Sequence, residues 1–230
     1  MGRIKSERVY NFTPDRIPSG NVIYWMSREQ RVSDNPGLLF ALSEAVERNT
    51  RITVVFTLTD NYPGAYLRHY DFMLKGLQEL AYRLKELNIP FNLLVGEPHE
   101  IMTDFAIKYN SSDIIVDFDP LKVKQSWINK IIKKSDVSVR EVDGHNVVPA
   151  RFVSDKVEFG AYTLRPKIHK SLEYFLEDFS SPLQMPSENY FRHHAFPQYF
   201  QQGIPNDILN KLDINRSVKP FEYMIPGEKA

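Results

Sequence analysis

The chain has 230 residues, and its 29 basic and 29 acidic side chains give a formal net charge of zero. This length suits one domain of ordinary size with an appendage. The balanced charge argues against a nonspecific DNA binder, because such a protein neutralises many phosphates with an excess of Lys and Arg. Since the chain contains no cysteine, it excludes disulfides, thiolate metal sites and cysteine nucleophiles.

No apolar run approaches the roughly 20 residues that span a bilayer. The first residues, MGRIKSERVYNF, lack the apolar core of a signal peptide. We therefore expect a cytoplasmic protein with no membrane partner.

Short β-branched runs alternate with longer segments of helical periodicity. Strands are expected at residues 22–25, 52–58, 91–95, 113–117 and 137–142, and helices at residues 36–48, 65–87, 98–109 and 120–134. The strands are almost continuously hydrophobic, which is typical of parallel strands buried on both faces. The strict alternation predicts an α/β fold, a five-stranded parallel, doubly wound (Rossmann-like) sheet with helices on both faces.

Prolines mark three of the expected helix starts. Pro36, Pro98 and Pro120 stand at first helical positions, where the missing N–H costs nothing. Asn35 and Asp119 precede two of these prolines, and their side chains are suited to cap exposed N–H groups.

The pattern changes after residue 142. We expect a loop at residues 143–149 and a further helix at residues 166–179, and we place the α/β domain at residues 1–180 with its core at about 20–180. Residues 181–230 contain six prolines and several aromatic residues, which is too aromatic for a disordered linker of ordinary composition. We expect an irregular extension that wraps over the domain or docks on another partner. His193-His194 within it is expected to be a surface feature rather than a metal site.

The stretch VIYWMSREQRVSDN, residues 22–35, is an apolar strand that opens into a polar loop. Open α/β sheets build their ligand crevices where strands end in this way. The loop contains no glycine, and the first glycine after the strand is Gly37. A phosphate-binding loop needs glycines so that backbone N–H groups can approach the anion. We therefore expect side chains to hold the ligand.

Polar and aromatic side chains gather where the expected strands end, and the carboxyl ends of parallel strands share one edge of the sheet. The candidates at this edge are Trp25, Arg28, Gln30, Arg31, Asp34, Asp60, Arg68, Asp117, Asp119, Lys122, His145 and Asn146. Taken singly, each has an ordinary role as a helix cap, a solvated charge or a core residue. Taken together, they predict a crevice for a flat ring system with polar edges.

Other features have plain structural interpretations. The lysines of the fourth expected helix are predicted to form a solvated basic face, namely Lys122, Lys124, Lys130, Lys133 and Lys134. Trp127 has the spacing of a core residue. No catalytic dyad or triad is evident, because Ser27 and Ser33 lack the glycines of a nucleophile elbow.

Five blocks of the sequence carry a family resemblance. They are YWMSREQRVSDN, FTLTD, YDFMLKGLQEL, VDFDPLKVKQSWI and EVDGHNVVPARFVSDKVEFGAYTLRPKI, in that order. Together they resemble the N-terminal α/β domain of class II cyclobutane pyrimidine dimer (deoxyribodipyrimidine) photolyases. The resemblance covers about residues 20–180 and resumes at PFEYMIPGEKA, which is similar to the linker into the helical domain of that family.

The resemblance implies a division of labour. In photolyases the helical domain holds FAD, binds the DNA lesion and splits the cyclobutane ring by light-driven electron transfer. The α/β domain houses an antenna chromophore, which is a deazaflavin, a folate or a flavin. We expect this chain to bind such a chromophore, a deazaflavin first among them. The resemblance places FAD, the DNA contact and catalysis in a helical domain that is absent from the chain, so we expect the chain alone to be inactive.

The resemblance also implies roles for residues of the crevice. Arg28 and Arg68 would pair with polar groups of the chromophore, Asp60 and Asp117 would accept hydrogen bonds, and Trp25 or Phe118 would stack on the ring. The complete predicted set is Trp25, Arg28, Arg31, Asp60, Arg68, Asp117, Phe118, Lys122, His145 and Asn146. No catalytic residue and no metal ligand is predicted.

Two other interpretations remain open. The chain can be a free-standing photolyase-like domain that binds a nucleotide or flavin without a role in repair. It can also be a protein-interaction domain that has lost its chromophore and docks a partner through its aromatic extension.

Overall fold

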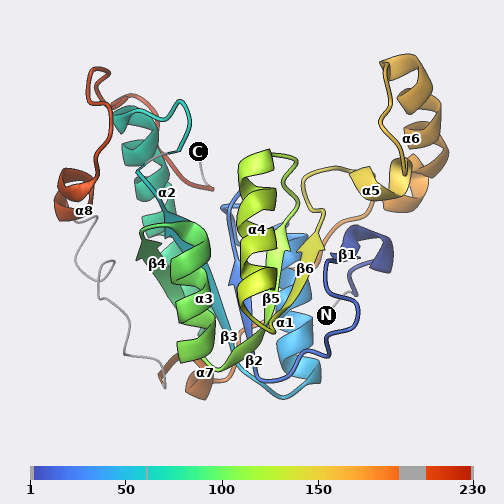
Figure 1. Ribbon diagram of the computed structural model, residues 1–230, viewed down its shortest axis with the longest axis horizontal. Helices are drawn as coiled ribbons and strands as arrows, with labels where there is room; N and C mark the ends of the chain where they lie inside the picture. Colours follow the sequence, from blue (N-terminus) through green and yellow to red (C-terminus); the bar gives the residue numbers. More distant parts are fainter. Residues whose placement is uncertain (1–2, 61, 192–205, 229–230) are drawn as a thin grey trace.

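The computed structural model describes residues 3–60, 62–191 and 206–228. Its centre is a sheet in the order β1-β6-β5-β2-β3-β4 (Figure 1). The strands are β1 (Val9–Asn11), β2 (Asn21–Trp25), β3 (Ile52–Leu58), β4 (Phe91–Val95), β5 (Ser111–Asp117) and β6 (Ser138–Val142). Strands β2 to β6 are parallel to one another, and this confirms the predicted α/β fold.

The sixth strand, β1, was not expected. It pairs antiparallel with β6 at the edge of the sheet, with Val9 opposite Val142 and Asn11 opposite Arg140. It has three residues, of which Tyr10 and Asn11 are exposed. So short and open a strand shows no hydrophobic run from which it can be recognised. It follows a single 3-10 turn, Ser6–Arg8.

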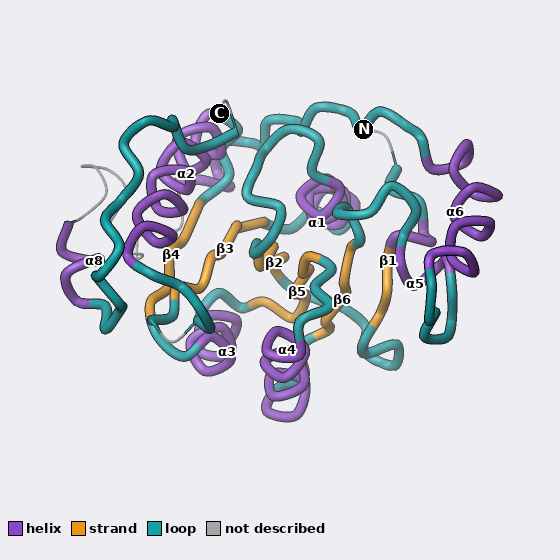
Figure 2. Tube along the Cα trace, turned by 90° about the horizontal axis from the view of Figure 1, so that it is seen from above, coloured by secondary structure: helices purple, strands orange, loops and turns teal. Residues whose placement is uncertain are grey.

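Four helices cover the two faces of the sheet (Figure 2). Helices α1 (Pro36–Glu47) and α2 (Leu67–Glu86) lie on one face, and α3 (Pro98–Lys108) and α4 (Lys122–Lys134) lie on the other. Alternate residues of β2 serve the two faces. Tyr24 belongs to the core under α1 and α2, whereas Ile23 and Trp25 belong to the core under α3 and α4.

The two predicted caps behave differently. Asn35 caps α1 as expected, because its Oδ1 accepts a hydrogen bond from Leu38 N at 2.8 Å. Helix α4, however, begins at Lys122 rather than at Pro120. Asp119 Oδ1 accepts from Leu121 N at 2.9 Å, so this carboxylate fixes the turn before α4 rather than the first N–H groups of the helix.

Two helices follow the sheet, α5 (Ala150–Val153) and α6 (Ala161–Phe175). The expected start of a helix at Pro166 was wrong, because α6 begins at Ala161 and contains this proline in its second turn. Gly160 starts the helix instead, and its carbonyl accepts from the N–H of Thr163 at 3.2 Å. The helix ends at Phe175, which is buried, four residues before the expected end.

The described parts of the C-terminal extension pack against the domain. They include α7 (Ser187–Phe191) and α8 (Asn206–Lys211). Met185 N donates to Leu87 O at 2.8 Å. Ile208 and Leu209 join the core beside α2. His193-His194 and Tyr199-Phe200 lie outside the described residues. Within the described ranges, none of the helices has the length and apolarity needed to cross a membrane.

Candidate functional site

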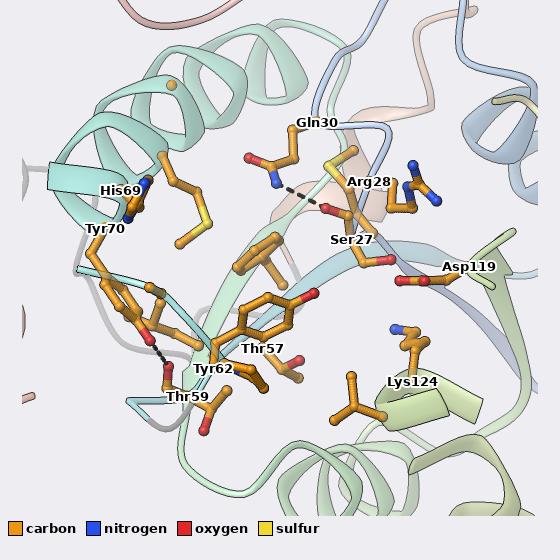
Figure 3. Close-up of a pocket in the computed structure, with 18 of the residues that line it drawn as sticks. Ser27, Arg28, Gln30, Thr57, Thr59, Tyr62, His69, Tyr70, Asp119 and Lys124 are labelled. Atoms are coloured by element: carbon orange, nitrogen blue, oxygen red, sulfur yellow. Dashed lines mark hydrogen bonds between the residues drawn. The ribbon is translucent and has the colours of Figure 1, made fainter. Parts of the chain in front are cut away.

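A cavity of about 620 Å³ opens at the carboxyl ends of β2 and β3, between α2 and α4 (Figure 3). Its volume lies in the range of about 300–1,000 Å³ that is usual for small-molecule sites. Most of its lining surface is apolar, and polar side chains contribute from the β2–α1 loop, from β3, from α2 and from α4 with the turn before it. The lining residues are Met26, Ser27, Arg28, Gln30, Phe56, Thr57, Leu58, Thr59, Tyr62, Pro63, Gly64, Ala65, His69, Tyr70, Phe72, Met73, Gly76, Asp119, Val123, Lys124, Trp127 and Gly227.

The loop between β2 and α1 is held from below by one buried carboxylate. Asp117 Oδ2 accepts hydrogen bonds from the backbone N–H groups of Ser27, Arg28 and Glu29 at 2.8, 2.8 and 3.0 Å. Its other oxygen accepts from the Tyr24 hydroxyl, and burial raises the pKa of that hydroxyl well above its usual range. The loop therefore does gather N–H groups around an anion, as phosphate loops do. The anion is a side chain of the neighbouring strand.

Side-chain amides close the same loop. Asn35 Nδ2 donates to Glu29 O at 3.0 Å and to Arg31 O at 2.8 Å. Gln30 Nε2 donates to Ser27 O at 2.8 Å. These bonds tie both ends of the loop together, so it presents Arg28 and Gln30 to the cavity from a fixed backbone.

A series of side-chain contacts links Arg28 to the buried Glu29. Arg28 Nη2 lies 2.8 Å from His145 Nε2, and His145 Nδ1 lies 3.4 Å from Glu29 Oε1. Because a guanidinium only donates hydrogen bonds, His145 Nε2 accepts and its Nδ1–H faces Glu29. Burial raises the pKa of Glu29, while Arg31, at 2.5 Å from Glu29 Oε2, opposes that change. His145 and Arg31 thus position the loop around Arg28.

Of the complete predicted chromophore set, Arg28 lines the cavity, and so do Gln30 and Asp119, which were named among the wider crevice candidates. Trp25 is 1% exposed, and its Nε1 donates to Thr57 Oγ1 at 3.0 Å from behind the lining. Asp117 lies beneath the loop. The others lie outside the lining: Phe118, Asp60 and Asn146 are half-buried, and Arg31, Arg68, Lys122 and His145 range from half-buried to exposed. The structure therefore joins Arg28, Arg31 and His145 in one cluster and leaves Asp60, Arg68 and Lys122 apart from it.

The α2 wall of the cavity was not predicted. Tyr70 donates its hydroxyl to Thr59 O at 2.6 Å (Figure 3). His69 Nδ1 accepts from Tyr66 N at 2.9 Å. Tyr62 precedes this helix and extends its ring into the cavity. The first turns of α2 therefore contribute both to the core against the sheet and to the ligand crevice.

Lys124 on α4 corrects a prediction. The lysines of this helix were expected to form a solvated basic face. Lys124, however, is 2% exposed, and its Nζ lies 3.2 Å from the centroid of the Trp25 ring. Burial lowers the pKa of Lys124 to about 7, against the nearby carboxylates of Asp117, Asp119 and Glu141. The signal was its spacing: Lys124 shares a helix face with Ile128 and Ile131, which are both buried.

The extension reaches the rim of the cavity. Gly227 belongs to the lining, and the next residue, Glu228, accepts from Val32 N at 2.8 Å and from Ser33 N at 3.0 Å. Arg83 of α2 pairs with the same carboxylate. These contacts fasten the end of the described chain to both the β2–α1 loop and α2.

The chain matches the family model of DNA photolyase over residues 22–187. It is 37% identical over 207 residues to the deoxyribodipyrimidine photo-lyase of Potorous tridactylus, covering 89% of this chain and 38% of that protein. It is 36% identical over 231 residues to the enzyme of the same name from Arabidopsis thaliana, covering 100% of this chain and 46% of that protein.

A solved structure shares the fold. The archaeal photolyase of Sulfolobus tokodaii, described with two FAD molecules, superimposes with a TM-score of 0.63 at 19% identity, over 91% of this chain and 44% of that one. The chain spans less than half the length of the curated relatives named above. On the extent of the family match, the chain belongs to the DNA photolyase family.

Proposed function

We propose that this chain is the light-harvesting domain of a class II DNA photolyase and binds an antenna chromophore in the cavity between α2 and α4. The observation that carries the proposal is the lining itself, in which aromatic and apolar side chains supply most of the surface and polar side chains stand between them on several sides. Such a lining suits a flat conjugated ring whose edges carry polar atoms. The relatives are named deoxyribodipyrimidine photo-lyases, which supports the assignment of this domain to such an enzyme.

A deazaflavin is the first candidate, with a folate or a flavin as alternatives. Phe56, Met73 and Trp127 offer apolar surface to the faces of a ring. A deazaflavin carries a carbon where a flavin has a ring nitrogen, so it needs one polar partner fewer from this lining. The Sulfolobus tokodaii photolyase is described as holding two FAD molecules, which are said to imply a novel light-harvesting cofactor. This description favours a flavin as the second candidate.

Arg28 is the predicted residue that we assign to direct contact with the chromophore. It stands at the rim, where His145 accepts one of its hydrogen bonds. Its remaining N–H groups are available to the polar tail or edge of the ring. Arg31 and His145 act as positioning residues for Arg28. Trp25 lies behind the lining and positions Thr57 and Lys124, which do line the cavity.

Repair belongs to the whole enzyme in this proposal. A helical domain with FAD would bind the DNA lesion and split the cyclobutane ring, and this α/β domain would pass excitation energy to it. The balanced charge of the chain supports a DNA contact made by the other domain.

Binding is tested with the purified chain. A deazaflavin, a folate and FAD are added separately, and absorption and fluorescence are recorded for each. We expect saturable binding of at least one ring, with the deazaflavin the tightest. Binding of none contradicts the antenna function. A parallel assay under light, with FAD and dimer-containing DNA, should show no repair, and repair by this chain would contradict the division between domains.

A further inference from the structure

One wall of the cavity, formed by α4 and the turn before it and called the α4 wall below, holds two buried polar side chains with unused hydrogen-bonding capacity. Lys124 is 2% exposed and Asp119 is 5% exposed. Both line the cavity, and Figure 3 shows the amine and the carboxylate pointing into it from the same side. A buried charged group with too few hydrogen bonds is costly, and so it calls for a partner such as a water, an ion or a ligand.

The ammonium of Lys124 has no hydrogen bond or ion pair with any residue that the structure describes. Its recorded contact is with the face of Trp25, at 3.2 Å from the ring centroid. A cation over an aromatic ring is attracted by the ring quadrupole but keeps its three N–H donors. At least one donor of Lys124 is therefore left for an oxygen inside the cavity.

Asp119 divides its two oxygens between the backbone and the cavity. Oδ1 accepts from Leu121 N at 2.9 Å, and Gln125 Nε2 fixes the same residue by donating to its carbonyl at 2.7 Å. Within the described chain, Oδ2 has no hydrogen-bond donor. This wall thus offers one donor and one acceptor side by side on a fixed backbone.

The surrounding charges decide which ligand chemistry fits. Asp117, Asp119 and Glu141 all act on Lys124 by their negative charge. These carboxylates already offset the ammonium, so a further anion would meet repulsion from them. A neutral polar edge meets no such cost.

We propose that Lys124 and Asp119 together recognise the lactam or imide edge of a heterocycle, a carbonyl next to a ring N–H, and seat that edge against α4. Lys124 donates to the ring carbonyl, and Asp119 accepts from the ring N–H. The inference rests on the proposed function, since it assigns the orientation of the ring in the same cavity. Flavins, deazaflavins and pterins all carry such an edge, which gives one site the means to take any of them.

The experiment compares ligands that differ by one methyl group. The unmodified chain is titrated with riboflavin and 3-methylriboflavin, and with 5-deazariboflavin and its 3-methyl derivative, by fluorescence. Methylation removes the ring N–H and leaves Asp119 unpaired, so we expect binding at least about tenfold weaker for each methylated ring. Equal affinity within both pairs overturns the inference and leaves the proposed function intact. Failure of both unmethylated rings to bind contradicts the inference, and the proposed function falls with it only if folate does not bind either.

Two variants sharpen the same comparison. Asp119→Asn can keep its carbonyl on Leu121 N and turn its NH₂ group toward the cavity, where a donor replaces the acceptor. We expect riboflavin to bind about tenfold more weakly to this variant, with no remaining preference over 3-methylriboflavin. Lys124→Met keeps the apolar stem and should weaken both ligands to the same degree.

Two exposed residues supply matched controls, Asp104→Asn on α3 and Lys130→Met on α4. Both should bind riboflavin as the unmodified chain does. A preference for riboflavin that survives in Asp119→Asn assigns the ring N–H to another acceptor and overturns the proposed pair.

Discussion

The β2–α1 loop and the α4 wall border the same cavity but use their polar groups in opposite ways. At the loop, Asp117 of β5 and Asn35 direct their hydrogen bonds to the backbone of the loop itself. On the wall, Lys124 and Asp119 keep donors and acceptors that no described residue uses. The β2–α1 loop, which is the more recognisable sequence motif, therefore acts as scaffold, whereas α4 and the turn before it carry the groups that are free to meet a ligand.

The largest expected effect comes from breaking the scaffold. Asp117→Ala removes the acceptor of three backbone N–H groups and of the Tyr24 hydroxyl. Each buried donor left without a partner costs about 1–3 kcal/mol, so we expect the free energy of unfolding to fall by about 4 kcal/mol. Urea denaturation measures this loss. Asp104→Ala, exposed on α3, is the control. A loss below about 1 kcal/mol for Asp117→Ala would show that the loop does not depend on this carboxylate.

At the α4 wall, burial of Lys124 should lower the stability of the folded chain at neutral pH. The pKa of Lys124 is lowered from 10.5 to about 7, so the unfolded chain binds its proton more tightly than the folded one. The resulting penalty is fully present below pH 7 and disappears above pH 10.5. The unmodified chain should therefore gain about 3 kcal/mol relative to Lys124→Met between pH 7 and pH 9.5.

Urea unfolding of both proteins at the two pH values provides this comparison. Lys130→Met, exposed on the same helix, should follow the unmodified chain at both. A constant difference between the unmodified chain and Lys124→Met across this range would contradict the buried, partly neutral lysine.

A smaller effect is expected at the rim. Arg28→Glu reverses a charge on an exposed side chain whose backbone stays held by Asp117. We expect chromophore binding about tenfold weaker, with the free energy of unfolding changed by less than about 0.5 kcal/mol. Fluorescence titration and urea denaturation separate the two quantities. Unchanged affinity would remove Arg28 from the site.

Much of the scaffold could be predicted because its pattern is local. Continuous runs such as Ile52–Leu58 identify parallel strands, and Asn35-Pro36 identifies a helix start. The edge strand Val9–Asn11 could not be recognised, since its pairing with β6 comes from residues far away in the sequence. The meeting of Asp117 with the β2–α1 loop was foreseen from the parallel sheet, but its role depends on the pairing of Trp25 with Val116, which fixes where the carboxylate lies.

The cavity was harder to predict for a physical reason. Lysine in a helix normally extends to solvent, and only the face shared with Ile128 and Ile131 distinguishes Lys124 from Lys130. Tyr62 and Met73 line the site because of the path by which the chain leaves β3 and enters α2. Such a path is set by packing of the whole domain rather than by the residues themselves.

The most direct measurement is a crystal structure of the chain soaked with the deazaflavin. The ring is expected in the cavity between Met73 and Trp127, with its carbonyl and N–H edge on Lys124 and Asp119 and with Arg28 at the rim. A deazaflavin bound elsewhere on the domain, with this cavity empty, would contradict the proposed antenna site.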